Sequence, residues 1–181
     1  SLLVDIGGAL VRNNLAVKLD HEGAFTKLNG LYLLTRNQHV DYSTFIDHAV
    51  PFTHSAELFK GILAGNSRAV FGGKMLVRPG AQKITSYQTN KTLLLSEGSG
   101  VDTKPQLEIY ADDVKCGHGA AIGQIDPEAL FYLKSRGLDD EQANEMLTIG
   151  FTSEIVQSIK HIPLRAYFEQ LINVRLHEMH S

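Results

Sequence analysis

The sequence predicts a mostly β chain that ends in a group of α-helices. Up to about residue 123 the chain consists of short segments in which apolar and polar residues alternate, separated by Gly, Asn, Asp and Pro. This is the pattern of short strands joined by turns. After Gly123 the apolar residues recur at helical spacing instead. We therefore expect a β region over residues 1–123 and a helical region over residues 124–181.

The β region has two possible architectures. Alternation places Leu15, Val17 and Leu19 on one face of a strand. Four later segments of similar length follow one another without a long insert, at residues 50–63, 68–79, 83–95 and 106–118. Stacked coils of a β-solenoid would give this series, although no fixed period is visible. A sandwich explains the many short strands equally well, so the residues alone leave both open.

Two local features of the β region carry finer expectations. Gln88 and Asn90 lie two residues apart, and in stacked strands they are candidates for ladders of identical amides. The pair Gly72–Gly73 lacks the spacing of a phosphate-binding loop. We expect it to form a turn between two strands.

Three helices are expected after residue 123. Asp126 is a candidate N-cap, Pro127 fits the first helical position, and Gly137 marks the end of the first helix. A second helical run extends from residue 138 to Pro163, which interrupts it. The residues expected to face inward are Ala143, Met146, Leu147, Gly150, Phe151, Ile155 and Ile159 in this run, and Leu164, Phe168, Leu171, Ile172 and Leu176 in the third helix.

Composition excludes several classes of function. The chain has 181 residues, 43% of them hydrophobic, and a formal net charge of −3. This charge does not favour a nucleic-acid partner, and no apolar run is long enough to span a membrane. A single cysteine excludes an internal disulfide and fits a reducing compartment. Because the chain begins without Met on a strand-like segment, we expect it to be a fragment of a longer protein.

The only cysteine, Cys116, lies two residues before His118. In a strand both side chains point to the same face, about 7 Å apart along the strand. Thiolate and imidazole both bind iron, zinc or copper, but two ligands do not complete a site, so a metal would need ligands from another chain. From the residues alone, the simpler interpretation is a small buried thiol and a hydrogen-bonded core histidine.

No catalytic residue is predicted. A Cys–His nucleophile is less favoured, because nothing supplies an oxyanion hole or a third, orienting residue. Asp112 and Asp113 are adjacent, so in a strand they point to opposite faces and cannot act together as a carboxylate pair. A turn at the edge of a coil explains them better.

Residues 88–143 carry motifs that resemble the SufB/SufD family of iron–sulfur cluster assembly proteins. The motifs are Q-x-N-x-x-L-L-L-S at residues 88–96, P-x-L-E-I-x-A-D-D-V-K-C-x-H-G-A at residues 105–120 and L-F-Y-L-x-S-R-G at residues 130–137, with GFTSEI at residues 150–155. The resemblance implies a right-handed parallel β-helix followed by a C-terminal helical domain. It makes residues 1–123 the later part of the β-helix, with the family's N-terminal region absent.

The resemblance also implies a function and partners. It implies a cytoplasmic, non-catalytic scaffold that pairs with a SufB-like paralogue through the end of the β-helix. A SufC-type ABC ATPase would dock on the helices, over residues 127–176 and most exposed at residues 140–160. A homodimer is expected in isolation, with no nucleic-acid or membrane partner. The open alternatives are a carbohydrate-active β-helix enzyme and a plain dimerisation module.

The residue that follows His118 in the motif at residues 105–120 distinguishes the two kinds of family member. Gly119 follows His118, whereas SufB members carry a glutamate there, so the chain resembles the SufD-like members. The resemblance makes His118 an iron ligand or assembly-site residue at a subunit junction, and Cys116 a weaker candidate. It implies no cofactor bound stably by this chain alone. Iron or a nascent iron–sulfur cluster would be held there transiently, between subunits.

Overall fold

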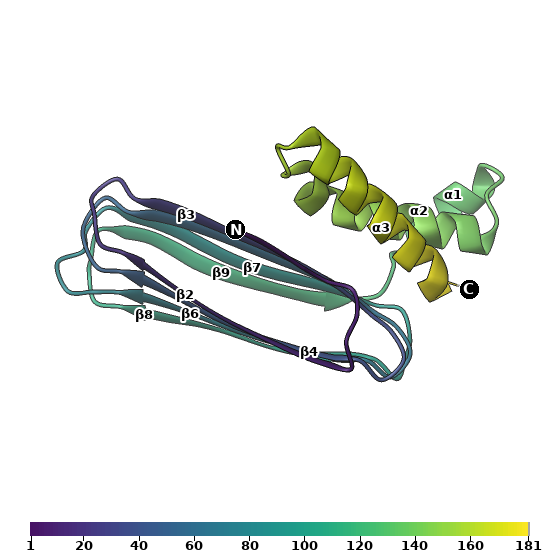
Figure 1. Ribbon diagram of the computed structural model, residues 1–181, viewed down its shortest axis with the longest axis horizontal. Helices are drawn as coiled ribbons and strands as arrows, with labels where there is room; N and C mark the ends of the chain where they lie inside the picture. Colours follow the sequence, from purple (N-terminus) through teal and green to yellow (C-terminus); the bar gives the residue numbers. More distant parts are fainter. Residues whose placement is uncertain (181) are drawn as a thin grey trace.

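The chain winds into a parallel β-solenoid of two sheets and is followed by three helices (Figure 1). The helices lie where the strands of one sheet end. The computed structural model describes residues 1–180. The strands are β1 (Leu2–Asp5), β2 (Leu10–Leu19), β3 (Phe25–Leu34), β4 (His39–His48), β5 (His54–Leu63), β6 (Arg68–Val77), β7 (Ile84–Leu94), β8 (Gly100–Ile109) and β9 (Val114–Gly123). The helices are α1 (Pro127–Ser135), α2 (Asp140–Gln157) and α3 (Ile162–His180).

Odd and even strands form separate sheets. The odd sheet has the order β1-β3-β5-β7-β9, the even sheet has the order β2-β4-β6-β8, and all pairs are parallel. Each strand pairs with a strand 27 to 32 residues further along the chain. This variation explains why the sequence shows no fixed period. The structure confirms the parallel β-helix with C-terminal helices and rules out the sandwich.

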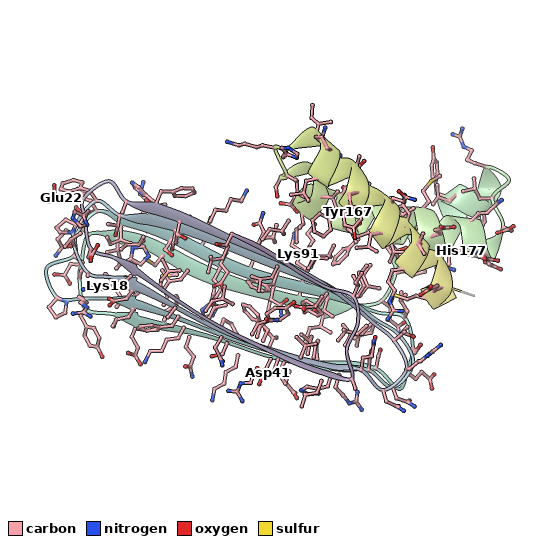
Figure 2. The ribbon with its side chains drawn as sticks, viewed as in Figure 1. Lys18, Glu22, Asp41, Lys91, Tyr167 and His177 are labelled. Carbon is pink, nitrogen blue, oxygen red and sulfur yellow. The ribbon has the colours of Figure 1, made fainter. Side chains whose placement is uncertain are left out.

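Side chains fill the space between the two sheets (Figure 2), and the largest of those in the early coils are aromatic. Tyr32, Tyr42, Phe59 and Phe71 come from four successive strands and are fully buried. Their ring centroids follow one another at 5.5, 4.9 and 4.8 Å. Contacts of this kind add to the burial of apolar area, so this stack is the main apolar core of the solenoid.

Two glycines make room for these rings. Gly30 pairs with Phe59, and Gly61 pairs with Tyr32. A Cβ on Gly61 would lie 2.0 Å from Tyr32 Cε2, and a Cβ on Gly30 would lie 2.2 Å from the ring of Phe59. In each of these two pairs, an aromatic ring on one strand therefore lies against a glycine on the strand of the adjacent coil.

The pair Gly72–Gly73 does not form the expected turn. Both residues lie within strand β6. A Cβ on Gly73 would meet the amide of Gln88 at 1.9 Å, whereas a Cβ on Gly72 would have no neighbour closer than 3.8 Å. Gly73 thus gives the Gln88 side chain room between the sheets.

The amide ladders predicted for Gln88 and Asn90 are also absent from the described residues. Gln88 is paired in register with Glu57 and His118, and Asn90 is paired with Phe59 and Ala120. Neither amide stacks on a second amide: Gln88 Nε2 donates to Glu57 Oε2, and Asn90 hydrogen-bonds with Thr103 and Tyr32.

The first helix begins where the sequence predicts, whereas α2 begins two residues later than expected and α3 begins at Ile162, with Pro163 inside its first turn. The Asp126 side chain caps α1 at the Glu128 amide, Pro127 is its first residue, and Gly137 takes a positive φ of 95° after it. A capping box between Asp139 and Gln142 begins α2. These caps fix the start of the helical region close behind β9.

Helices α2 and α3 pack on the outer face of the odd sheet, at the carboxyl ends of its strands (Figure 1). The shared cluster consists of Leu31, Leu33, Ile62, Ile155, Val156, Ile172 and Leu176. Lys60 crosses this interface: its ammonium donates to the Phe151 carbonyl at 3.0 Å and lies 2.7 Å from Glu154. Three expected inward residues, Met146, Gly150 and Leu164, are instead exposed, because α2 and α3 turn other faces to the sheet.

No helix among residues 1–180 is both long enough and apolar enough to cross a membrane.

The pairing of glycine with aromatic rings leads to a stability prediction. Gly61→Ala places a methyl group against the ring of Tyr32, so we expect the free energy of unfolding to fall by about 1–3 kcal/mol. Gly72→Ala is the matched control, since its methyl group would make only an ordinary van der Waals contact with the Tyr42 carbonyl oxygen, at 3.8 Å. Urea denaturation of both variants measures the difference. Equal stability of the two variants would contradict the close packing of ring and backbone.

Candidate functional site

The solenoid ends in an open rung. Strand β9 is the last strand of the odd sheet and β8 is the last strand of the even sheet. Within residues 1–180, each pairs with a neighbour on one side only. Pro105 lies within β8. Because proline has no backbone N–H to donate to a neighbouring strand, it is confined in sheets to edge positions such as this one. Unpaired strand edges are a template for pairing with another chain.

Cys116 and His118 both lie on this last rung, on the face that points between the sheets. Cys116 packs against Met75, Val77 and Ile84, which belong to the inner core. The two residues share one face of β9, as the parity of the sequence predicts. His118 is exposed at the mouth of the solenoid, and no hydrogen bond or ion pair joins it to the other described side chains.

The environment of Cys116 makes it the weaker of the two candidates. The thiol is half-buried, and burial raises its pKa, with partial compensation by a hydrogen bond from the Ser86 backbone. A thiol is a ligand or nucleophile only as the thiolate. Among residues 1–180, no three His, Cys, Asp or Glu side chains lie close enough to hold a metal ion.

Polar side chains replace apolar ones in the coil beneath this rung. After Ile84, four successive inward residues of β7 are polar, namely Ser86, Gln88, Asn90 and Thr92, and each is at most 2% exposed. Asn90 donates to Thr103 at 3.1 Å and accepts from the Tyr32 hydroxyl at 3.1 Å, and Thr92 lies 2.8 Å from the same hydroxyl. The sequence marked only the two amides of this row. The open end therefore has a polar floor.

A carboxylate and an amide lie in register beneath His118. Gln88 is the pairing partner of His118, and Glu57 is the pairing partner of Gln88. Gln88 Nε2 donates to Glu57 Oε2. Gln88 Oε1 and Glu57 Oε1 are buried without a hydrogen-bond partner among the described residues. Burial raises the pKa of Glu57, and the neighbouring Thr44 hydroxyl and Gln88 amide offset part of this effect.

A second polar file lies beneath Cys116. Ser86 is the pairing partner of Cys116, and its hydroxyl contacts the Ser55 hydroxyl. Ser55 lies 3.0 Å from His48 Nε2, and Thr53 lies 2.8 Å from His48 Nδ1. Both ring nitrogens of this buried histidine are thus occupied by hydroxyls. Burial lowers the pKa of His48 to about 4.

The pair Asp112–Asp113 lies in the bend before β9, as expected. Asp113 pairs with Lys83, and its backbone amide donates to Gln82 at 2.8 Å. The first carboxylate is exposed. These contacts give the aspartates a structural role at the turn.

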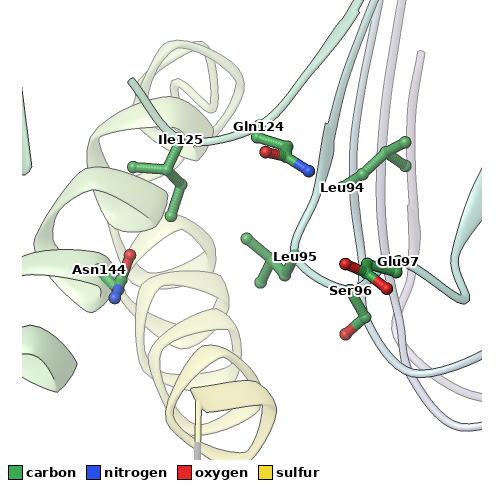
Figure 3. Close-up of a pocket in the computed structure, with 7 residues that line it drawn as sticks. All are labelled: Leu94, Leu95, Ser96, Glu97, Gln124, Ile125 and Asn144. Atoms are coloured by element: carbon green, nitrogen blue, oxygen red, sulfur yellow. The ribbon is translucent and has the colours of Figure 1, made fainter. Parts of the chain in front are cut away.

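A pocket of about 320 Å³ lies away from the open rung, where the corner after β7 meets the link to α1 (Figure 3). Its lining residues are Leu94, Leu95, Ser96, Glu97, Gln124, Ile125 and Asn144. Glu97 is the only titratable side chain among them, and Cys116 and His118 do not line the pocket. We therefore assign it to the seam between solenoid and helices.

Comparison with known proteins places the chain in context. The family model described as "SUF system FeS cluster assembly, SufBD core domain" matches residues 1–151. The chain is 39% identical over 171 residues to the iron–sulfur cluster assembly protein SufD of Escherichia coli (strain K12), covering 94% of this chain and 40% of that protein. It is 36% identical over 186 residues to an iron–sulfur cluster assembly SufBD family protein of Mycobacterium leprae, covering 98% and 47%. A SufBD family protein of Synechocystis is 37% identical over 172 residues, covering 95% and 38%. The chain thus spans less than half the length of these relatives.

The buried histidine leads to a pH prediction. Because the pKa of His48 falls from 6.5 to about 4 on folding, the unfolded chain binds more protons than the folded chain between these values. The stability that neutral His48 contributes is complete above pH 6.5 and is lost as the pH falls towards 4, by roughly 2–4 kcal/mol. Urea denaturation between pH 4 and pH 7 measures this slope.

The matched variants for this test are His48→Gln, which removes the titrating ring, and His54→Gln, which removes an exposed one. We expect a shallower slope only for His48→Gln. An unchanged slope in that variant would contradict a buried, neutral His48.

Proposed function

This chain belongs to the SufBD family of iron–sulfur cluster assembly proteins, and from that premise we propose that it is a SufD-like, non-catalytic scaffold subunit. In this proposal the chain works in the cytoplasm in a complex with a SufB-like paralogue and a SufC-type ABC ATPase. Residues 1–123 supply the pairing end, and residues 124–181 form the domain on which the ATPase docks.

The observation that carries this proposal is the open rung with two inward-facing ligand types. Imidazole and thiolate are ligands for iron and for iron–sulfur clusters. Cys116 and His118 can supply at most two ligands from one strand, so the remaining ligands would come from the chain that pairs with β9. This fits transient iron or a nascent cluster as cargo between subunits.

Pairing at the open rung also explains the self-association that we propose for the isolated chain. The edges of β8 and β9 offer unpaired backbone donors and acceptors. A SufB-like solenoid would continue both sheets across the junction. In its absence a second copy of this chain would serve, which gives a homodimer.

The proposed ATPase dock is the outer surface of α1 and α2. Phe131 is 73% exposed, Tyr132 is 57% exposed and Met146 is 51% exposed. A groove of about 560 Å³ lies along α2 and is lined by Leu138, Gln142, Glu145, Met146 and Ile149. Aromatic side chains that are exposed in one chain are frequent anchors of protein interfaces.

The role of His118 is tested by removing its ring. His118 is exposed and makes no contact on which folding depends, so His118→Ala should fold normally. We expect cluster assembly in cells that depend on this protein to fall at least about tenfold, since lost metal-site interactions typically cost 10–100-fold. Lys115→Ala, on the opposite face of β9, is the matched control and should have no effect. Normal cluster assembly by His118→Ala would exclude the role of His118.

The dock is tested with surface variants, because deleting the helices would expose the cluster around Leu31 and Ile62. We expect Phe131→Ser combined with Tyr132→Ser to weaken binding of the SufC-type ATPase at least about tenfold. The control is Tyr110→Ser. Tyr110 directly follows β8, away from the helices, and its side chain is about as exposed as that of Tyr132. Calorimetry gives the affinities. Unchanged binding by the double variant would place the dock elsewhere.

A further inference from the structure

One buried amide in the solenoid is only half satisfied by hydrogen bonds. Gln88 is 2% exposed, and its Nε2 donates to Glu57 Oε2. This bond fixes which end of the amide faces the carboxyl group. Gln88 Oε1 is left buried without a partner among the described residues. A buried acceptor left unsatisfied costs about 1–3 kcal/mol, so its retention calls for an explanation.

The backbone around Gln88 holds the amide where it is. Gly73 lies on the opposite sheet, and a Cβ there would lie 1.9 Å from Gln88 Nε2. The side chain therefore extends across the interior at a position kept clear for it. Beneath it, Glu57 is 3% exposed and anchors the amide from the previous coil.

The residue above Gln88 is a histidine. His118 pairs with Gln88 across β7 and β9 and turns its side chain to the same interior. Inward side chains that are directly paired in adjacent strands lie about 5 Å apart. An imidazole at that position carries a ring N–H, and Gln88 Oε1 is an acceptor without a partner.

We propose that Gln88, anchored by Glu57, is the positioning residue of His118: the His118 side chain, which makes no hydrogen bond to the other described residues in this structure, rotates inward so that one ring nitrogen donates to Gln88 Oε1. The other ring nitrogen is then left without a proton and faces the open end. A ligating histidine commonly donates its second N–H to such an acceptor, which fixes the tautomer and the orientation of the ring. This inference deepens the proposed function, and rests on it for the purpose of the free nitrogen.

The test reads the tautomer of His118 directly, in the iron-free chain, by long-range ¹H–¹⁵N correlation of the histidine rings. We expect one dominant tautomer in the unsubstituted chain. Gln88→Met keeps the length of the side chain and removes the acceptor, so the ratio of the two tautomers should shift by about three- to tenfold. Thr92→Val, a buried polar group on the same strand with no histidine above it, is the control and should leave the ratio unchanged.

A paired exchange guards against a variant that fails to fold. The double variant Glu57→Gln with Gln88→Glu keeps one donor and one acceptor in the same two coils. We expect it to retain the dominant tautomer. The same tautomer ratio in the unsubstituted chain and in folded Gln88→Met would overturn the proposal, and so would a mixed ratio in the folded double variant. Because no iron is present, this outcome is independent of the cluster-assembly result for His118→Ala.

Discussion

Hydrogen bonding between successive coils is the constraint on which this structure depends. Each strand of the solenoid satisfies its backbone groups only through the strands one coil before and one coil after it. Nothing within residues 1–180 meets this need for the outer edges of β8 and β9. Helices α2 and α3 cover the outer face of the odd sheet at the carboxyl ends of its strands (Figure 1). The interaction that builds the fold therefore also leaves unpaired edges at β8 and β9, which are the edges that our proposal pairs with a second solenoid.

The interior changes in character along the axis. The early coils hold the aromatic stack, in which each ring lies against a glycine or another ring. The coil beneath the open rung holds hydroxyls, amides and, through Glu57, a carboxyl group. Buried polar groups cost free energy unless they are satisfied, so an apolar row would stabilise the solenoid better. The polar row is instead explained if it supports the residues of the last rung, with Gln88 beneath His118 and the file from His48 to Ser86 beneath Cys116.

The sequence predicted the helices closely, because Asp126, Pro127 and Gly137 act through local geometry. It could not separate a solenoid from a sandwich, because both have strands of the same length and alternation, and the coil offset varies. Gly72–Gly73 was wrongly expected to be a turn, since the need for space opposite Gln88 arises only when two sheets face each other. Cys116 and His118 were found by parity along one strand. Glu57, 61 residues before His118, became part of the site only through the register of three coils.

The central claim is that β9 is a pairing edge that another solenoid completes. Hydrogen exchange of the β9 amides, in the chain alone and after addition of the SufB-like paralogue, tests it most directly. The account predicts that the outward-pointing amides of β9 exchange at least about tenfold more slowly in the complex, as expected for amides that enter a ladder. The amides of β3, which already lies between β1 and β5, should not change. A complex that forms while β9 exchanges at its original rate would contradict the account.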